Sequence, residues 1–153
     1  KMKLLQVTPN LTTFTAVLKA TYQLGDIYTA NEVVKEIKYL GYEINTYIVT
    51  GLLRTYAGAV RIPFVDQKHV EQYLKDAWDL INFAEKNFIT INIFTLNALL
   101  ELHCAALKWE QVDGLVIPFF NKHNVQLDIF SYDFIIQMLN NLRNYKALIS
   151  VYK

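Results

Sequence analysis

Hydrophobic residues recur every three or four positions along most of this chain, a spacing that places them on one face of an α-helix. Between Leu11 and Asn45 the pattern divides into two halves at Gly25-Asp26. The positions that carry it are Phe14, Val17, Leu18 and Tyr22 in the first half, and Ala30, Val33, Val34 and Ile37 in the second. The pattern therefore predicts a helical hairpin, with Gly41 positioned to end its second helix in a left-handed conformation.

The same arrangement recurs along the chain. First helices are predicted near residues 12–23, 46–57, 93–106 and 130–142, and second helices near 70–86, near 109–122 and from about Asn144. A two-residue joint precedes each first helix and ends in Asn or Asp, both common N-caps. The joints are Pro9-Asn10, Ile44-Asn45, Ile91-Asn92 and Leu127-Asp128, separated by 35, 47 and 36 residues. A repeat of this length that consists of helices predicts a solenoid whose first helices line one concave surface.

Two segments depart from the regular plan. The long interval contains an insertion at Gly58–Gln67, and its Gly and Pro residues predict a loop between the two helices of one repeat. Its apolar residues are unusual for a loop, so we expect them to pack on a neighbouring repeat or on another subunit; they are Val60, Ile62, Pro63, Phe64 and Val65. Gly114 and Pro118 lie within a second helix and are expected to kink or weaken it.

The repeat register divides the chain into one array. It predicts the end of a repeat over 1–10, complete repeats over 11–45, 46–92 and 93–128, and the start of another over 129–153. Neither end has the polar outer face of a capping repeat, so we expect the chain to be a window from a longer solenoid.

Composition and charge limit the function classes. The chain is 53% apolar and 19% charged with a net charge of +1, which excludes a disordered chain and a protein held on nucleic acid by charge alone. No catalytic motif is present, and His69, His103 and His123 lack the spacing of metal ligands, so neither an enzyme nor a cofactor is expected. The single cysteine, Cys104, lies in an apolar helix and is expected to be a buried small side chain. No apolar run is long enough to insert into a membrane.

The sequence resembles the pentatricopeptide repeat family over nearly its whole length. The period of 35 residues, the Gly25 break, the Gly41 stop and the Pro9-Asn10 joint carry the resemblance, together with small residues in second helices at Ala30 and Ala77 and a methionine at Met2. The tetratricopeptide repeat has a period of about 34 residues and a Trp-containing first helix, which Trp78 and Trp109 do not supply. The resemblance implies an all-α, right-handed α-solenoid of helix-turn-helix repeats.

In this family each repeat can read one base of single-stranded RNA. The resemblance implies that the fifth residue of each first helix faces the base, together with the last residue of the same repeat. The implied pairs are Thr15 with Asn45, Thr50 with Asn92, and Asn97 with Asp128, a combination that favours adenine, adenine and uracil. Amide, hydroxyl and carboxylate groups suit the Watson–Crick edge of a splayed base. Asn10, Asn45 and Asn92 are equally explained as helix caps, without any RNA.

The second residue of each first helix is implied to lie between neighbouring bases. Three of these residues are aromatic and are candidates for base stacking or, alternatively, for packing between repeats: Tyr47, Phe94 and Phe130. RNA-binding members usually carry a Lys late in the first helix, a place held here by Gln23, Gly58, Ala105 and Asn141. The candidates for phosphate contacts are therefore Lys19 and Arg54, while Glu101 and Asp133 oppose them.

Two hypotheses of function follow. The first is an RNA-binding protein of a mitochondrion or plastid that acts in RNA processing, stability or translation. The second is a protein scaffold within a large organellar ribonucleoprotein such as the mitochondrial ribosome, where the partners are ribosomal RNA and protein subunits. The near-neutral charge and high apolar content favour the second, and the base-facing pairs favour the first.

Overall fold

The computed structural model describes residues 7–153, in which helices joined by short loops are the only regular secondary structure and no strand occurs. The helices in chain order are α1 (Leu11–Leu24), α2 (Ile27–Tyr39), α3 (Thr46–Val60), α4 (Gln67–Lys86), α5 (Ile93–Ala105), α6 (Trp109–Gln111), the π-helix η1 (Val112–Val116), α7 (Ile117–Lys122), α8 (Ile129–Asn141) and α9 (Tyr145–Tyr152). The expected end of a preceding helix over residues 1–6, with Met2, lies outside the described residues.

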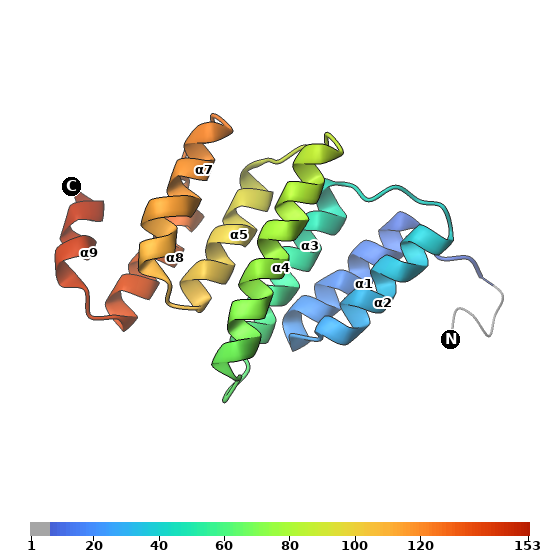
Figure 1. The fold of residues 1–153 in the computed structure, drawn as a ribbon, viewed down its shortest axis with the longest axis horizontal. Coiled ribbons are helices and arrows are strands. Elements are labelled where there is room, and N and C mark those ends of the chain that lie inside the picture. The colour runs from blue at the N-terminus through green and yellow to red at the C-terminus, as the bar shows by residue number, and fades with distance from the viewer. Residues whose placement is uncertain (1–6) are drawn as a thin grey trace.

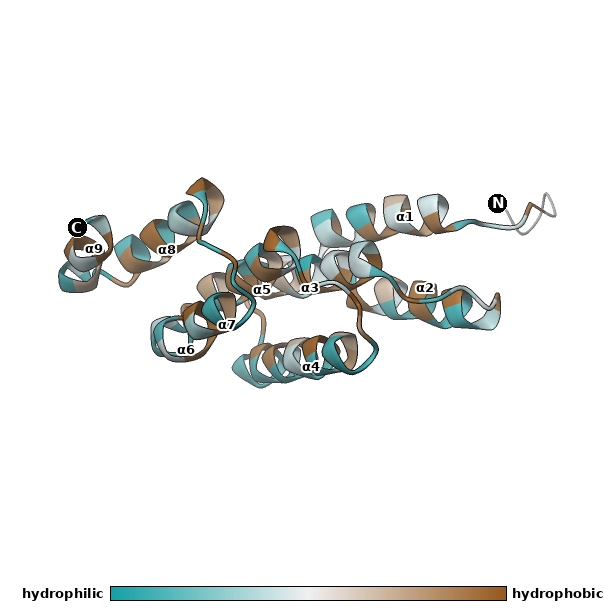
Figure 2. Cartoon of the chain, turned by 90° about the horizontal axis from the view of Figure 1, so that it is seen from above, coloured by the Kyte–Doolittle hydropathy of each residue, from teal (hydrophilic) through white to brown (hydrophobic). Residues whose placement is uncertain are grey.

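The helices form two layers, as the sequence pattern predicts (Figure 1). The first helices pack on one another in order, α1 on α3, α3 on α5 and α5 on α8. Seen from above, they follow an arc in which α3 and α5 lie lower than α1 and α8, with α2 and α4 on the outer side (Figure 2). The expected all-α solenoid of helical hairpins, with first helices along a concave face, is confirmed.

Each recurring joint is a helix cap. The side chains of Asn10, Asn45, Asn92 and Asp128 accept hydrogen bonds from the backbone N–H of the third helical residue, at 2.9 to 3.1 Å. Such a cap satisfies a backbone donor that has no partner within its helix, and contributes about 1 kcal/mol. The joint that marks the repeat in the sequence is thus the signal that starts each first helix.

The helices also end in a shared way. Gly25 and Gly41 have φ angles of 65° and 77°, the left-handed conformation that glycine adopts without a steric penalty. In later repeats the same conformation is taken by Leu107, after α5, and by Phe88, after α4, with φ of 58° and 54°. A side chain in this conformation costs about 1 kcal/mol, so the later turns are less favourable than the first ones.

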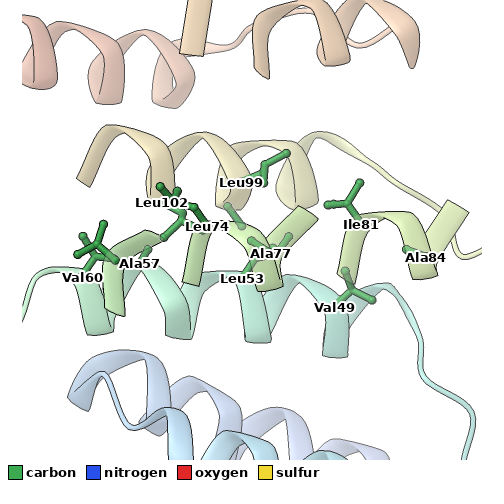
Figure 3. Close-up of a cluster of buried hydrophobic side chains, with 12 residues drawn as sticks. Val49, Leu53, Ala57, Val60, Leu74, Ala77, Ile81, Ala84, Leu99 and Leu102 are labelled. Carbon is green, nitrogen blue, oxygen red and sulfur yellow. The ribbon is translucent and has the colours of Figure 1, made fainter. Parts of the chain in front are cut away.

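Apolar side chains from neighbouring repeats form three buried clusters between the helices of the described chain. In Figure 3, Leu53 of α3, Ala77 of α4 and Leu99 of α5 meet in a buried cluster, and all three are fully buried. Ala30 is buried in the equivalent cluster of the first hairpin. Small residues at these positions let the second helices lie close to the first ones.

The expected loop over Gly58–Gln67 is shorter in the structure and covers Arg61–Asp66. Gly58 lies within α3. A Cβ atom there would lie 2.3 Å from the carbonyl oxygen of Tyr22, so glycine lets α1 and α3 approach this closely. Val60 is buried and Val65 packs against the core, as expected. Phe64, in contrast, is fully exposed in this chain.

The expected distortion of the second helix after α5 is also present. The backbone adopts a π-helix over Val112–Val116, directly before α7, whose second residue is Pro118. Proline has no N–H to donate to the preceding turn, and a π-helical turn accommodates the interrupted ladder.

Candidate nucleic-acid interface

A groove of about 760 Å³ crosses the inner faces of α1 and α3 and reaches the start of α5. Among its lining residues are Thr15, Lys19, Tyr47, Thr50, Arg54 and Phe94. None of the residues that line it is acidic. The groove therefore combines hydroxyl groups, aromatic rings and two cations on one surface.

The register of the first helices explains why these side chains converge. Counted from the first helical residue, the second position holds Thr12, Tyr47, Phe94 and Phe130, the fifth holds Thr15, Thr50, Asn97 and Asp133, and the ninth holds Lys19, Arg54, Glu101 and Gln137. Because the helices stack in parallel register, each position forms a row along the concave face. The groove contains the α1 and α3 members of all three rows.

The aromatic row is open to solvent. Tyr47, Phe94 and Phe130 are 72%, 63% and 66% exposed, so they do not form the packing between repeats that was the alternative. Tyr47 and Phe94 line the groove, whereas Phe130 lies beyond it. An exposed ring at this spacing offers a face on which a base can stack.

The fifth row changes along the array. Thr15 is exposed, and its hydroxyl donates to the Leu11 carbonyl oxygen at 2.8 Å, which leaves the oxygen able to accept. The Thr50 hydroxyl lies 3.0 Å from that of Thr95, which belongs to the next first helix. Asn45 and Asn92, the partners implied for these residues, both use a side-chain oxygen as a helix cap, and Asn92 lines the groove.

The third pair, Asn97 with Asp128, is closed within the protein. Asn97 is only 7% exposed; its Nδ2 donates to Asp128 at 3.0 Å, and its Oδ1 accepts from the Ser131 hydroxyl at 2.5 Å. Burial opposes the charge on Asp128, but hydrogen bonds from the Ser131 backbone and from Asn97 outweigh it and hold the pKa of Asp128 below its ordinary value. The carboxylate orients Asn97, as its place in the sequence suggests, but Ser131 occupies the other end of the amide.

The ninth row carries the charge of the concave face. Lys19 and Arg54 form no ion pair within residues 7–153, and the Arg54 Nε is buried with no hydrogen-bond partner. A buried guanidinium N–H without an acceptor is costly, and a guanidinium binds anionic oxygens more strongly than neutral ones. These two residues are the cations expected from the sequence.

Glu101 occupies the same row but is neutralised by the protein. Its carboxylate accepts from Arg61 at 2.6 Å and from the Tyr22 hydroxyl at 3.1 Å, so residues of three successive repeats meet there. Sequence reasoning missed the roles of Tyr22, Arg61 and Ser131, since each lies more than 30 residues from its partner. The available signal was an acidic residue within a largely apolar helix.

Other candidate chemistry is accounted for by packing. His103 is buried, with Nε2 accepting from the Trp78 indole at 3.1 Å and Nδ1 donating to the Leu99 carbonyl oxygen. Burial raises the pKa of the Cys104 thiol to about 12, which leaves it unreactive.

Over residues 7–153, no three His, Cys, Asp or Glu side chains gather as they would around a metal ion. In the same range no helix combines the length and apolar character that crossing a bilayer requires.

The chain is similar to known repeat proteins in sequence and in structure. The model of the pentatricopeptide repeat domain matches residues 1–43, which confirms the resemblance over that segment. Two solved structures of the pentatricopeptide repeat protein PPR10 with an 18-nucleotide psaJ RNA element, one of them a triple Cys-to-Ser variant, align with 99% of the chain at 15% identity and a TM-score of 0.43. The chain spans 30% of the length of those proteins. No curated protein gives a significant match.

Proposed function

We propose that this chain, an array of helical hairpins that begins with a pentatricopeptide repeat, binds single-stranded RNA in the groove across α1 and α3. The groove itself carries the proposal. Its lining holds two cations that form no ion pair within residues 7–153 and can contact phosphates. It also holds exposed rings for stacking and hydroxyl groups for base edges, with no acidic residue among the lining residues. Binding, rather than catalysis, is the activity that this set of groups supports.

Single strands are favoured over duplexes for a physical reason. The rings of Tyr47 and Phe94 can stack only on bases whose faces are open, and in a duplex those faces are covered by neighbouring base pairs. Thr15 and Thr50, with Asn45 and Asn92, are then the base-facing pairs, and the resemblance assigns adenine to both. Each hydrogen bond of this kind contributes about 0.5–1.5 kcal/mol, so selection at one base is modest.

The cellular setting is part of the same proposal. We place the protein in a mitochondrion or plastid, acting in RNA processing, stability or translation, on the resemblance to the pentatricopeptide repeat family. Fractionation of cells that express the tagged protein tests the compartment. Recovery in the nucleus or cytosol alone would contradict it without affecting the assignment of the groove.

The direct test is binding of fluorescent oligonucleotides at several salt concentrations. We expect an unstructured RNA to bind more tightly than a duplex of the same sequence. The slope of log affinity against log salt should be about −0.7 for each phosphate held, hence between −1 and −2 for Lys19 and Arg54. Equal affinity for duplex and single strand, or affinity that salt does not change, would contradict the proposal.

A scaffold role is the second candidate, and one observation favours it. Phe64 and Phe88 are almost fully exposed on turns at opposite ends of α4, and both have positive φ angles where glycine would be more favourable. Apolar side chains retained in this conformation suit a protein partner. If the protein sediments with a large organellar complex after ribonuclease treatment, and Phe64→Ser with Phe88→Ser abolishes this, the scaffold role is supported.

A further inference from the structure

We propose that the third residue of each first helix determines whether the fifth residue of the preceding first helix is available to an RNA base. The proposal rests on the function proposed above and concerns the selectivity of the same surface. The third positions of α3, α5 and α8 hold Ile48, Thr95 and Ser131. Their polarity increases along the array, and the availability of the fifth-position side chains decreases in the same order.

At the α5–α8 junction the third residue of α8, Ser131, hydrogen-bonds to the fifth residue of α5, Asn97. The Ser131 hydroxyl lies 2.5 Å from the Asn97 Oδ1, and Asp128 holds the Asn97 Nδ2 at 3.0 Å. Ser131 is fully buried, so water does not compete for this bond. A base that offers an N–H group must compete with Ser131 at the Asn97 carbonyl, whose oxygen is buried and already accepts one hydrogen bond.

At the α3–α5 junction the restraint is partial. The Thr95 hydroxyl lies 3.0 Å from the Thr50 hydroxyl and 3.1 Å from the Asn92 Oδ1. Since a hydroxyl has one proton and two lone pairs, the bond with Thr95 leaves the Thr50 hydroxyl two further hydrogen-bonding positions. Thr50 is half-buried, between the exposure of Thr15 and that of Asn97.

At the α1–α3 junction no described side chain of α3 hydrogen-bonds to the fifth residue of α1, Thr15. Ile48 has no hydrogen-bonding side chain and is buried in the apolar cluster between these helices. Thr15 bonds only within its own helix and remains exposed. Thr15 of α1 is therefore accessible to a base, and Thr50 of α3 is accessible in part. Asn97 of α5 is buried and bonded within the protein.

The test is selectivity measured one base at a time. The full chain is titrated with unstructured RNAs that carry each of the four bases at three consecutive positions, at fixed salt. The wild type should discriminate most at one end of this window and least at the position that faces Asn97. Ser131→Ala should raise discrimination at that position alone by about twofold to tenfold, the value of one net hydrogen bond. Ser131→Thr, which keeps the hydroxyl, is the matched control and should behave like the wild type.

A second variant keeps the test decisive if Ser131→Ala folds poorly. Thr95→Val is nearly isosteric and should raise discrimination at the middle position, where Thr50 faces the base. If the wild type binds RNA and neither variant changes its selectivity, the inference is wrong while the proposed function stands. If the wild type binds no single-stranded RNA at all, the proposed function fails and the inference fails with it.

Discussion

The α1–α3 groove and the α5–α8 junction share one helix register, but they differ in which side chains are free to contact a ligand. In the groove, Thr15 is exposed and Lys19 and Arg54 have no counter-ion within the described chain. At the junction, Asn97 is buried between Asp128 and Ser131, and Glu101 takes the place of a cation. The residue pair that best fits base recognition by sequence is thus the one that the protein engages most completely.

This difference shows that a repeat position has no fixed role on its own. Lys19, Arg54 and Glu101 occupy equivalent places, yet only the third is held by groups from other repeats. What decides the outcome is contact with side chains of other repeats, which for Glu101 lie 40 and 79 residues away in sequence. The two regions can be tested separately because different residues define them.

Reversing the charge of the groove should have the largest effect. Lys19→Glu with Arg54→Glu removes two charge-assisted contacts and adds repulsion, which is expected to cost about 3 kcal/mol or more, roughly a hundredfold in RNA affinity. Arg143→Glu with Lys146→Glu, near the α8–α9 turn, is the matched control and should change affinity little. Equal losses from both pairs, in filter binding at fixed salt, would remove the distinction between the two regions.

The close approach of α1 to α3 can be broken next. Gly58→Ala places a Cβ atom against the Tyr22 carbonyl oxygen, and overpacking of this kind destabilises by about 1–3 kcal/mol. Gly114→Ala is the control, because nothing lies within 4 Å of its Cβ position and alanine favours a helix. Thermal unfolding measures both. A Gly58→Ala protein as stable as the wild type would show that the contact tolerates movement.

These contacts also indicate what the sequence alone can predict. The caps at Asn45, Asn92 and Asp128 are local signals, since each side chain bonds to backbone three residues ahead, so the helix starts were predictable. Gly58 was assigned to a loop because glycine breaks isolated helices, whereas here it serves a contact with another helix. That requirement depends on tertiary packing and has no local signal.

Some features of the candidate site could likewise be predicted from the sequence, and others could not. The aromatic row and the two cations follow from the register, and the structure places those of α1 and α3, with Phe94, in the groove. The burial of Asn97 does not follow from the register, because it depends on a hydroxyl 34 residues away. Periodicity fixes which residues share a row, but not which of them bond to the adjacent helix.

The buried His103 should make the stability of the fold depend on pH. Burial lowers the pKa of His103, against the opposing effect of its hydrogen bond to Leu99, so the folded protein holds it neutral. The unfolded chain then binds the proton more readily. Stability should be complete above about pH 6.5 and should fall below it by at most about 1.4 kcal/mol per pH unit. His103→Phe should flatten the dependence of unfolding free energy on pH, measured by chemical denaturation at several pH values.

The smallest expected effect concerns the turns. Gly25 and Leu107 occupy equivalent left-handed positions after α1 and α5. Leu107→Gly should stabilise the C-terminal half by about 0.5–1 kcal/mol, since it relieves the penalty of a side chain at positive φ. Chemical denaturation measures the gain. A loss of stability instead would indicate that the half-exposed Leu107 side chain contributes packing that outweighs the strain.

Photocrosslinking of a bound RNA tests the central claim most directly. An unstructured RNA with a photoreactive uridine at successive positions is bound to the full chain, irradiated, and the modified residues are identified by mass spectrometry. We expect crosslinks at Tyr47 and Phe94, which line the groove, and few or none at Phe130, which is equally exposed but lies beside the closed junction. Crosslinks concentrated at Phe130, or spread equally over the three rings, would contradict the account.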